Sequence, residues 1–230
     1  MNASAKHCVA LLGGSFDPVH HGHVALARMF CDLLHPDALR VLPAKPWQKS
    51  SLQASDEERV AMLELAFKEF GDSGLQVVID QREIERGISS YTVETLRGLR
   101  EELGPDASIV FLMGADQLQN LSSWREWQQL FVLANIGVAA RPGYTLQQEA
   151  LPPAVASALA PRLAPPEHLR TTPAGLVCLA HTLAVDISAT AVRALLHKEG
   201  QPGGDTTSSV NSLVPPVVLD YIQQHHLYKN

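Results

Sequence analysis

The chain has 230 residues, a formal net charge of −6 and a pI near 5.9. This length fits a single α/β domain with its own core, whereas a general nucleic-acid-binding protein would need a surplus of Lys and Arg. No apolar run is long enough to span a membrane, residues 1–6 contain no signal-peptide core, and the three cysteines form no framework. We therefore expect a soluble cytoplasmic protein that binds neither nucleic acid nor membrane.

The first predicted elements enclose a glycine-rich turn. The apolar run 8–12 predicts a buried strand, residues 24–30 predict a helix, and GGSFDPVHHGH at 13–23 lies between them. Paired glycines allow close approach of the backbone to a ligand, and a helix N-terminus attracts anions through its free N–H groups and its dipole. His20 and His23 are three residues apart, so both side chains can donate to phosphate oxygens at the start of the helix.

A zinc site is the main alternative interpretation of the histidines. Imidazole is a common zinc ligand, but the cysteines lack paired-ligand spacing and the chain has no HExxH motif. We expect no metal site built from protein side chains.

Strand-like and helix-like segments alternate along the rest of the chain. Strands are predicted at 38–42, 76–79, 108–113 and 136–140, and helices at 55–70, 92–103 and 217–222. The predicted helix at 55–70 begins with Ser55-Asp56-Glu57-Glu58, which has the pattern of a capping box. Regular alternation predicts a doubly wound parallel sheet, with ligands bound beyond the carboxyl ends of the strands at the switch in strand order.

Two stretches interrupt this alternation. Residues 145–173 are rich in Pro and Ala and predict an irregular surface excursion, with room for one short helix at 154–163. Residues 200–212 predict a flexible loop. No interdomain linker is visible, so residues 1–230 are expected to form one domain with a small C-terminal helical portion.

A second motif, DISATAVR, occupies residues 186–193. Ser188 is a plausible N-cap, Thr190 lies in the first turn, and Arg193 is long enough to fold back toward the helix start. Hydroxyls, free amides and a guanidinium together suit a polyphosphate. An ordinary capped helix with a surface arginine explains this segment equally simply when it is taken alone.

Both motifs are similar to signatures of one family. The first resembles the GGxFDPxHxGH signature of the nicotinate-nucleotide adenylyltransferases, in the HxGH nucleotidyltransferase superfamily. The second resembles the ISxTxxR signature of the same superfamily, whose Ser, Thr and Arg bind the ATP phosphates. The resemblance covers most of residues 7–228. It implies a Rossmann-like fold, ATP with Mg²⁺, and transfer of the adenylyl group to nicotinate mononucleotide in NAD synthesis.

The resemblance also implies roles for individual residues. Catalytic roles fall to His20, His23 and Arg193. The residues implied at ATP are Gly13, Gly14, Ser15, Phe16, His20, Gly22, His23, Gly114, Asp116, Ile187, Ser188, Thr190 and Arg193. Those implied at the mononucleotide are Asp17, Lys49, Tyr91, Thr92, Met113, Trp124 and Arg141.

Several of these assignments have simpler alternatives. Trp124 and Trp127 are as well explained as core residues as by stacking on the pyridine ring, although Trp124 matches the family position. Lys49 is matched mainly by its position, since Trp47 and Gln48 replace the usual residues before it; a surface lysine without a specific role is the simpler alternative, and Lys45 is a rival. Arg141 precedes Pro142-Gly143, and a turn explains that segment equally well.

Other functions stay open. Nicotinamide mononucleotide and phosphopantetheine are rival acceptors, although phosphopantetheine adenylyltransferases have shorter chains and normally a Thr where His20 stands. A catalytically silent nucleotide-binding regulatory protein is a further alternative, and intact His20, His23 and Arg193 argue against it. The sequence also leaves open a homo-oligomer.

Overall fold

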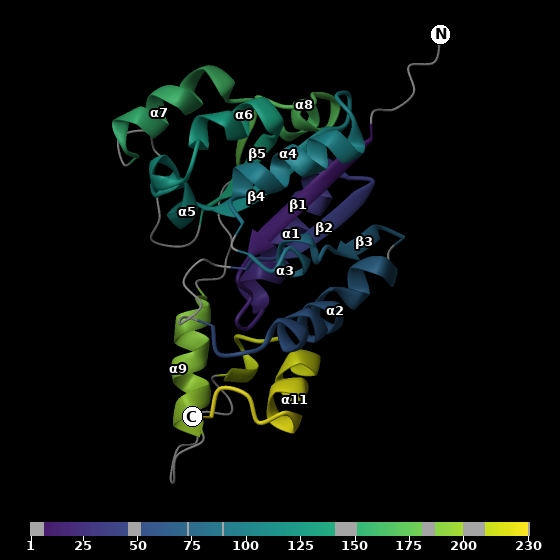
Figure 1. Cartoon of the computed structure of the whole chain (residues 1–230), viewed down its shortest axis with the longest axis vertical. Helices are drawn as coiled ribbons and strands as arrows, with labels where there is room; N and C mark the ends of the chain where they lie inside the picture. Colours follow the sequence, from purple (N-terminus) through teal and green to yellow (C-terminus); the bar gives the residue numbers. More distant parts are fainter. Residues whose placement is uncertain are drawn as a thin grey trace.

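A six-stranded parallel sheet forms the centre of the molecule (Figure 1). The computed structural model describes residues 7–45, 52–72, 74–88, 90–140, 151–180, 187–199 and 210–229. Its strands are β1 (Cys8–Gly14), β2 (Ala38–Pro43), β3 (Gln76–Ile79), β4 (Ser108–Gly114), β5 (Asn135–Ala139) and β6 (Val177–Ala180). Their spatial order is β3-β2-β1-β4-β5-β6, so the direction of winding reverses between β1 and β4. This reversal confirms the predicted doubly wound sheet.

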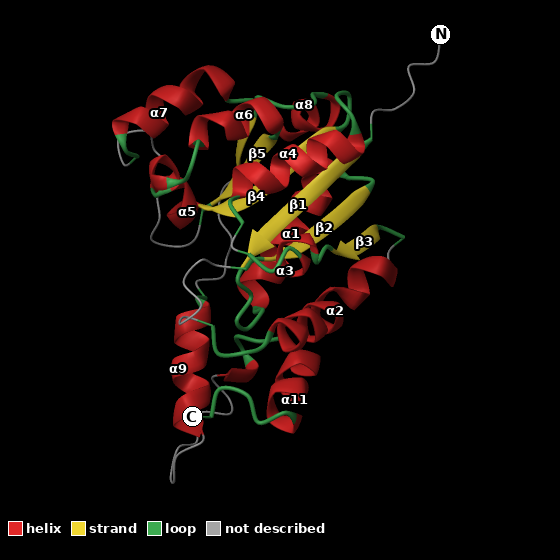
Figure 2. Ribbon diagram, viewed as in Figure 1, coloured by secondary structure: helices red, strands yellow, loops and turns green. Residues whose placement is uncertain are grey.

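Helices cover both faces of the sheet (Figure 2). The helices are α1 (His21–Leu34), α2 (Asp56–Asp72), α3 (Arg82–Glu85), α4 (Thr92–Leu103), α5 (Ala115–Gln119), α6 (Leu130–Leu133), α7 (Pro153–Leu159), α8 (Pro166–Thr171), α9 (Ala189–Glu199) and α11 (Pro216–Gln224). Short 3₁₀ turns are η2 (Leu121–Ser123), η3 (Trp127–Gln129) and η5 (Ala160–Arg162).

Alternating strand side chains build two separate cores. In β4, Val110 and Leu112 pack with residues of α1, α2 and α8, whereas Ile109 and Phe111 pack with residues of α4, α5, α6 and α7. A strand buried on both faces needs an apolar side chain at nearly every position, which is why β1 and β4 are continuous apolar runs.

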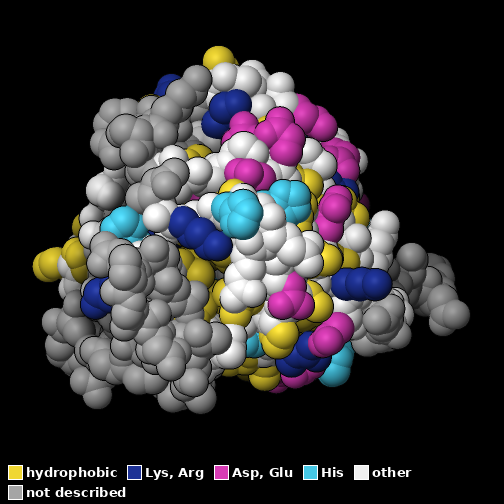
Figure 3. Space-filling view, turned by 90° about the horizontal axis from the view of Figure 1, so that it is seen from below, with side chains coloured by type: hydrophobic (Ala, Val, Ile, Leu, Met, Phe, Trp, Pro, Cys, Tyr) yellow, Lys and Arg dark blue, Asp and Glu magenta, His cyan; other side chains and the backbone are white. Residues whose placement is uncertain are grey.

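The helices α9 and α11 lie beyond the carboxyl ends of β1 and β2 (Figure 1). Val192 of α9 and Leu219 of α11 are buried in the same core cluster as α2, so these helices belong to the body of the molecule. The face seen from this side carries acidic, basic and histidine side chains in mixture, with acidic groups gathered toward one side (Figure 3).

Most of the predicted elements are confirmed. Strands β2 to β5 match the prediction to within one residue at each end, and α4 has the predicted bounds. The capping box is present, since the Ser55 backbone N–H donates to Glu58 Oε2 at 2.7 Å and the Glu58 backbone N–H donates to Ser55 Oγ at 3.2 Å.

The prediction of an irregular excursion at 145–173 was wrong for its described part, residues 151–173, except that α7 and η5 confirm the short helix allowed at 154–163. Pro153 and Pro166 stand at helix N-termini, where a proline needs no N–H partner, and so they start α7 and α8 rather than break them. Val155, Leu159 and Leu169 are fully or almost fully buried, which makes this segment part of the crossover from β5 to β6. The four-residue strand β6 was not predicted at all.

Of the predicted loop 200–212, residues 200–209 lie outside the described part of the chain, and Val210 is buried. Among the described helices, none combines the length and the apolar character needed to cross a membrane.

Candidate active site

The helix α1 begins at the predicted anion site with its two histidines in contact. His20 is the N-cap residue, in extended conformation, and its backbone N–H donates to His23 Nδ1 at 3.3 Å. The two rings stack with centroids 3.7 Å apart and planes 19° from parallel. Because Nδ1 of His23 accepts a hydrogen bond, the ring proton of neutral His23 lies on Nε2, which is then the atom able to donate to a ligand.

Gly22 makes room for this arrangement. A Cβ atom at Gly22 would lie 3.0 Å from Nδ1 and 3.1 Å from Cε1 of His20, and 3.6 Å from the carbonyl oxygen of Ile187. A side chain here would therefore push against the His20 ring, which is only 1 % exposed. The glycine of the first motif thus permits close packing between His20 and the start of the second motif.

The ring of Phe16 packs against the ring of His23. Phe16 is fully buried, has a φ of 47°, and places its ring edge against His23 with centroids 4.8 Å apart. A Cβ atom at Gly14 would lie 3.1 Å from the same ring. Phe16 was expected at ATP, but its burial gives it the role of fixing the position of His23.

Asp17 was expected to contact the mononucleotide, and the structure corrects this. Asp17 is fully buried, and its carboxylate accepts hydrogen bonds from the backbone N–H groups of Gln53 at 2.9 Å and Ala54 at 3.1 Å. The Tyr228 hydroxyl donates to the same carboxylate at 2.7 Å. Burial and the nearby Asp17 charge raise the pKa of Tyr228, so it acts as a neutral donor. Asp17 therefore fixes the loop from inside.

Arg193 joins the second motif to the first. Its Nη1 donates to the backbone oxygen of Asp17 at 2.6 Å, and its Nη2 donates to Thr190 Oγ1 at 3.5 Å. Ser188 caps α9, since its Oγ accepts from the Ala191 backbone N–H at 3.2 Å. The helix is thus capped as predicted, while Arg193 crosses to the β1–α1 loop and does not lie free on the surface.

A buried arginine that sequence analysis missed also holds this loop. Arg59 of α2 is fully buried, and its Nη1 donates to the carbonyl oxygen of Ser15 at 2.7 Å while its Nη2 donates to Asp56 at 2.7 Å. Lys45 Nζ lies 3.1 Å from the same Asp56 carboxylate. Burial works to raise the pKa of Asp56, but the hydrogen bonds from Arg59 and Lys45 outweigh it and keep that pKa below its usual value.

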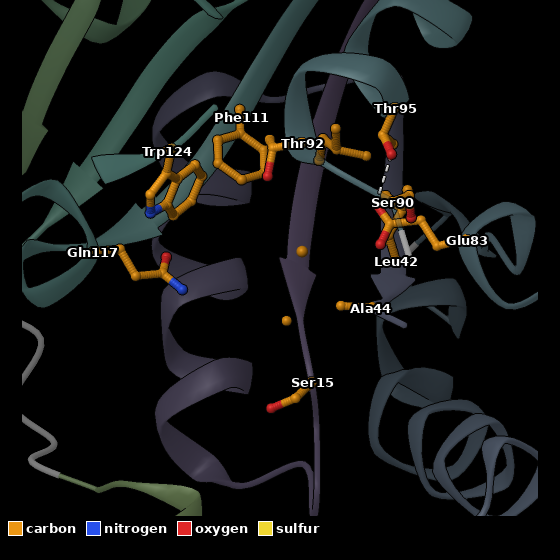
Figure 4. Close-up of a pocket in the computed structure, with 13 residues that line it drawn as sticks. Ser15, Leu42, Ala44, Glu83, Ser90, Thr92, Thr95, Phe111, Gln117 and Trp124 are labelled. Carbon is orange, nitrogen blue, oxygen red and sulfur yellow. Dashed lines mark hydrogen bonds between the residues drawn. The ribbon is translucent and has the colours of Figure 1, made fainter. Parts of the chain in front are cut away.

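A cavity of about 280 Å³ opens beside the glycine turn, at the switch point between β1 and β4 (Figure 4). Trp124 and Gln117 border it on one side, Glu83 and Ser90 on the other, and Ser15 lies at its lower end. It is lined by Leu11, Gly13, Gly14, Ser15, Leu42, Ala44, Glu83, Ser90, Thr92, Thr95, Phe111, Gln117 and Trp124. An apolar and aromatic wall with a few polar groups is typical of a small-molecule or cofactor site.

The two tryptophans have different positions. Trp124 lines the cavity and meets Phe111 edge to face, with centroids 6.2 Å apart. Trp127 packs instead against Phe131, also 6.2 Å between centroids. Of the two residues that the sequence left open, only Trp124 therefore borders the cavity.

A second hollow of about 390 Å³ continues the first. It shares Ser90, Thr92 and Trp124 with the cavity and adds Tyr91, Ser123 and Arg125. The Arg125 guanidinium carbon lies 4.8 Å from the centre of the Tyr91 ring. The predicted Tyr-Thr pair and Trp124 are thus brought together at one end of a continuous site, with a cation beside them.

Two polar residues of the cavity that follow strand ends, Glu83 and Gln117, were not predicted, and neither was Thr95 of α4. Glu83 in α3 is buried and accepts a hydrogen bond from Thr95 Oγ1 at 2.7 Å, and Gln117 lies one turn beyond the end of β4. Glu83 follows the carboxyl end of β3 and Gln117 that of β4. Because ligands bind beyond these strand ends, their positions in the sequence could have indicated that they border the site.

Five further residues were expected at the substrates, and the structure describes three of them. Gly114 is the N-cap of α5 and Asp116 lies in its first turn, whereas the Met113 side chain is fully buried in the core and does not line the cavity. Its expected contact with the mononucleotide is therefore not supported. Lys49 and Arg141 lie outside the described residues.

Comparison with known proteins places these features in a family. The cytidylyltransferase-like family model matches residues 11–195. A relative from Herminiimonas arsenicoxydans, named "Probable nicotinate-nucleotide adenylyltransferase", is 54% identical over 228 residues, covering 99% of each chain. A second, from Laribacter hongkongensis and with the same name, is 42% identical over 231 residues, covering 100% of this chain and 98% of the relative. The chain belongs to the nicotinate-nucleotide adenylyltransferase family.

Solved structures show the same fold. The nicotinic acid mononucleotide adenylyltransferase of Plasmodium falciparum, complexed with NaAD, matches with a TM-score of 0.72 at 18% identity, covering 96% of this chain and 97% of that one. The same enzyme complexed with APC matches equally well. At this identity, the likeness concerns the fold alone.

Proposed function

We propose that the chain transfers the adenylyl group of ATP to nicotinate mononucleotide, giving nicotinate adenine dinucleotide and pyrophosphate, a step of NAD synthesis. The observation that carries this proposal is the contact between the two motifs. Arg193 reaches the Asp17 backbone at 2.6 Å, beside the stacked His20 and His23 at the N-terminus of α1. One site thus combines donors for a polyphosphate with an aromatic cavity of about 280 Å³.

The reaction needs no protein nucleophile. A phosphate oxygen of the mononucleotide attacks the α-phosphorus of ATP, a P–O bond forms, and the bond to the β-phosphate oxygen breaks as pyrophosphate leaves. The protein must align these groups and stabilise the negative charge that develops. Nε2–H of His23 and the positive end of the α1 dipole would stabilise the α-phosphate, while the backbone N–H groups of His21 and His23 already donate to the carbonyl oxygens of Leu213 and His20.

The two other parts of the substrates would bind on either side of this centre. Ser188, Thr190 and Arg193 would hold the β- and γ-phosphates, because hydroxyls and a guanidinium surround one helix start. Trp124 would stack on the pyridine ring of the mononucleotide, with Thr92 and Tyr91 at its carboxylate. Arg125 lies at that end, but its guanidinium is ion-paired with Glu94 at 3.4 Å and with Glu126 at 3.7 Å, so its charge alone gives no preference for an acid over an amide.

Mg²⁺ would enter with ATP. The described residues contain no group of three or more His, Cys, Asp or Glu side chains able to hold a metal ion. Hydroxyl, imidazole and guanidinium donors suit phosphate oxygens, so the ion would be held by those oxygens and by water. When bound, it would neutralise charge on the phosphates. The cytoplasm, which supplies ATP and Mg²⁺, is the expected location.

Pyrophosphate release from purified protein tests the proposal. The assay contains ATP and Mg²⁺ and compares nicotinate mononucleotide, nicotinamide mononucleotide and phosphopantetheine in parallel. A clear preference for nicotinate mononucleotide supports the assignment. Turnover with another acceptor would keep adenylyl transfer but overturn the roles of Tyr91, Thr92 and Trp124. Binding of ATP without turnover on any acceptor would favour a silent nucleotide-binding protein.

A further inference from the structure

The carboxylate of Asp17 connects three distant parts of the chain. Its Oδ1 accepts from the backbone N–H of Ala54 and from the Tyr228 hydroxyl, and its Oδ2 accepts from the backbone N–H of Gln53. Tyr228 is separated from Asp17 by 211 positions and is itself only 6 % exposed. The phosphate-site loop is therefore bonded to a residue that carries no motif.

Arg193 lies close to this carboxylate without forming a direct hydrogen bond to it. Its Nη1 is 3.8 Å from Asp17 Oδ2, while the same nitrogen donates to the Asp17 backbone oxygen at 2.6 Å. A buried carboxylate depends more on a nearby cation when fewer hydrogen bonds stabilise its charge. The donors around Asp17 thus determine how strongly the guanidinium is drawn inward.

Tyr228 is placed to supply one of those donors. Its φ of 62° lies in the left-handed region that non-glycine residues rarely adopt, so its side-chain contacts hold it there. Its ring belongs to the core cluster that includes Val192 of α9 and Leu219 of α11. Burial also keeps the hydroxyl protonated by raising its pKa, so the oxygen donates to Asp17.

We propose that Tyr228 is a positioning residue for ATP: its hydroxyl satisfies part of the Asp17 charge and thereby leaves the Arg193 guanidinium directed at the polyphosphate. Without this hydroxyl, Arg193 moves toward Oδ2 of Asp17 and loses contact with the phosphates. The inference rests on the proposed function for the identity of the phosphate ligand.

Tyr228→Phe tests this by removing one oxygen and keeping the ring. Loss of a hydrogen bond to a buried charge is expected to raise the Kd and KM for ATP about tenfold. The KM for nicotinate mononucleotide should stay within about twofold of wild type, since that substrate does not depend on Arg193. Tyr221→Phe removes a hydroxyl from α11, away from Asp17, and is the matched control.

A double-mutant cycle with Arg193→Gln separates this effect from a general loss of stability. Tyr228→Phe should have little further effect on the ATP Kd once Arg193 is absent. The proposal would be overturned if Tyr228→Phe raised the ATP Kd equally in the wild-type and Arg193→Gln proteins. Equal increases in the KM of both substrates, or an unchanged ATP Kd, would also overturn it. The rise in melting temperature caused by ATP gives the same comparison if the variant is less stable. Because ATP binding is measured directly, a wild-type protein that binds ATP without turnover contradicts the proposed function only.

Discussion

At the scale of single residues, the two ring nitrogens of His23 are proposed to have different functions. Nδ1 accepts from the His20 backbone at the start of α1, and Nε2–H is the group that we propose as a donor to the transferring phosphate. In His23→Asn, the amide oxygen can take over the acceptor position of Nδ1, but no group replaces Nε2–H. We expect kcat to fall about a hundredfold or more, with a nearly unchanged Kd for ATP.

Measuring both constants on purified protein checks this prediction. His197→Asn makes the same chemical change at an exposed position of α9 and should leave kcat unchanged. A His23→Asn enzyme with normal kcat would remove His23 from the mechanism.

The packing of Gly22 makes a second prediction at this scale. In Gly22→Ala the new methyl group would lie 3.0 Å from the His20 ring, closer than ordinary contact allows, so the ring must move. A displaced donor weakens stabilisation of the transition state, and kcat should fall about tenfold or more while the protein stays folded. Gly71→Ala, where a Cβ atom meets nothing within 4 Å, is the matched control. Equal activities of the two variants would contradict the packing argument.

At the scale of elements, local sequence signals worked where the cause of the structure is itself local. The capping box at the start of α2 consists of two hydrogen bonds between Ser55 and Glu58, three residues apart. Strand β6 is as short as β3, which was predicted, but it was missed because its burial depends on pairing with β5. The prolines of this segment favoured the prediction of an irregular excursion, although a short helix was allowed at 154–163; only the fold shows that a second helix, α8, starts at Pro166.

Ser55→Ala should destabilise the protein through the loss of this cap. We expect a cost of about 1 kcal/mol, or a fall of roughly 2–4 °C in melting temperature for a domain of this size. Ser122→Ala, at an exposed position in η2, should leave the melting temperature unchanged. A thermal melt of both variants decides the matter, and equal melting temperatures would show that the capping box contributes nothing to stability.

At the scale of the whole molecule, a charged network fastens the β2–β3 edge to α4. Glu102 accepts from Arg40 at 2.5 Å and from Arg82 at 2.6 Å. The hydrogen bond from Arg40, together with that from Arg82, outweighs the effect of burial and lowers the pKa of Glu102 to about 2. This carboxylate therefore stabilises the fold above its ordinary pKa of about 4.3, and the contribution is lost as the pH falls toward 2.

Glu102→Gln should accordingly be less stable than wild type at pH 7, with a difference that shrinks as the pH falls from about 4.3 toward 2. Since the Glu102 side chain is 44% exposed, solvent screening limits the difference to about 1 kcal/mol or less. Urea unfolding at a series of pH values measures it. Glu101→Gln at the exposed neighbouring position is the control. If the stability difference between wild type and Glu102→Gln grew as the pH fell, the assigned direction of the Glu102 pKa shift would be wrong.

The candidate site could be predicted only where it consists of motifs. The motifs GGSFDPVHHGH and DISATAVR can be recognised from the spacing of their residues. Trp124 can be recognised because it matches a family position. Arg59 and Tyr228 carry no local signal, because their importance arises from contacts with Ser15 and Asp17 far away in the sequence. Pairing across such distances is a property of the folded chain.

The bond between Asp17 and Tyr228 bears on how the protein is synthesised. A ribosome makes the β1–α1 loop early, yet two of its partners, Leu213 at the His21 backbone and Tyr228 at Asp17, are added roughly two hundred residues later. A nascent chain that has not reached residue 228 already contains Arg59, Gln53 and Ala54 but lacks the Tyr228 contact with this loop. The full set of contacts around the β1–α1 loop is therefore completed only near the end of translation.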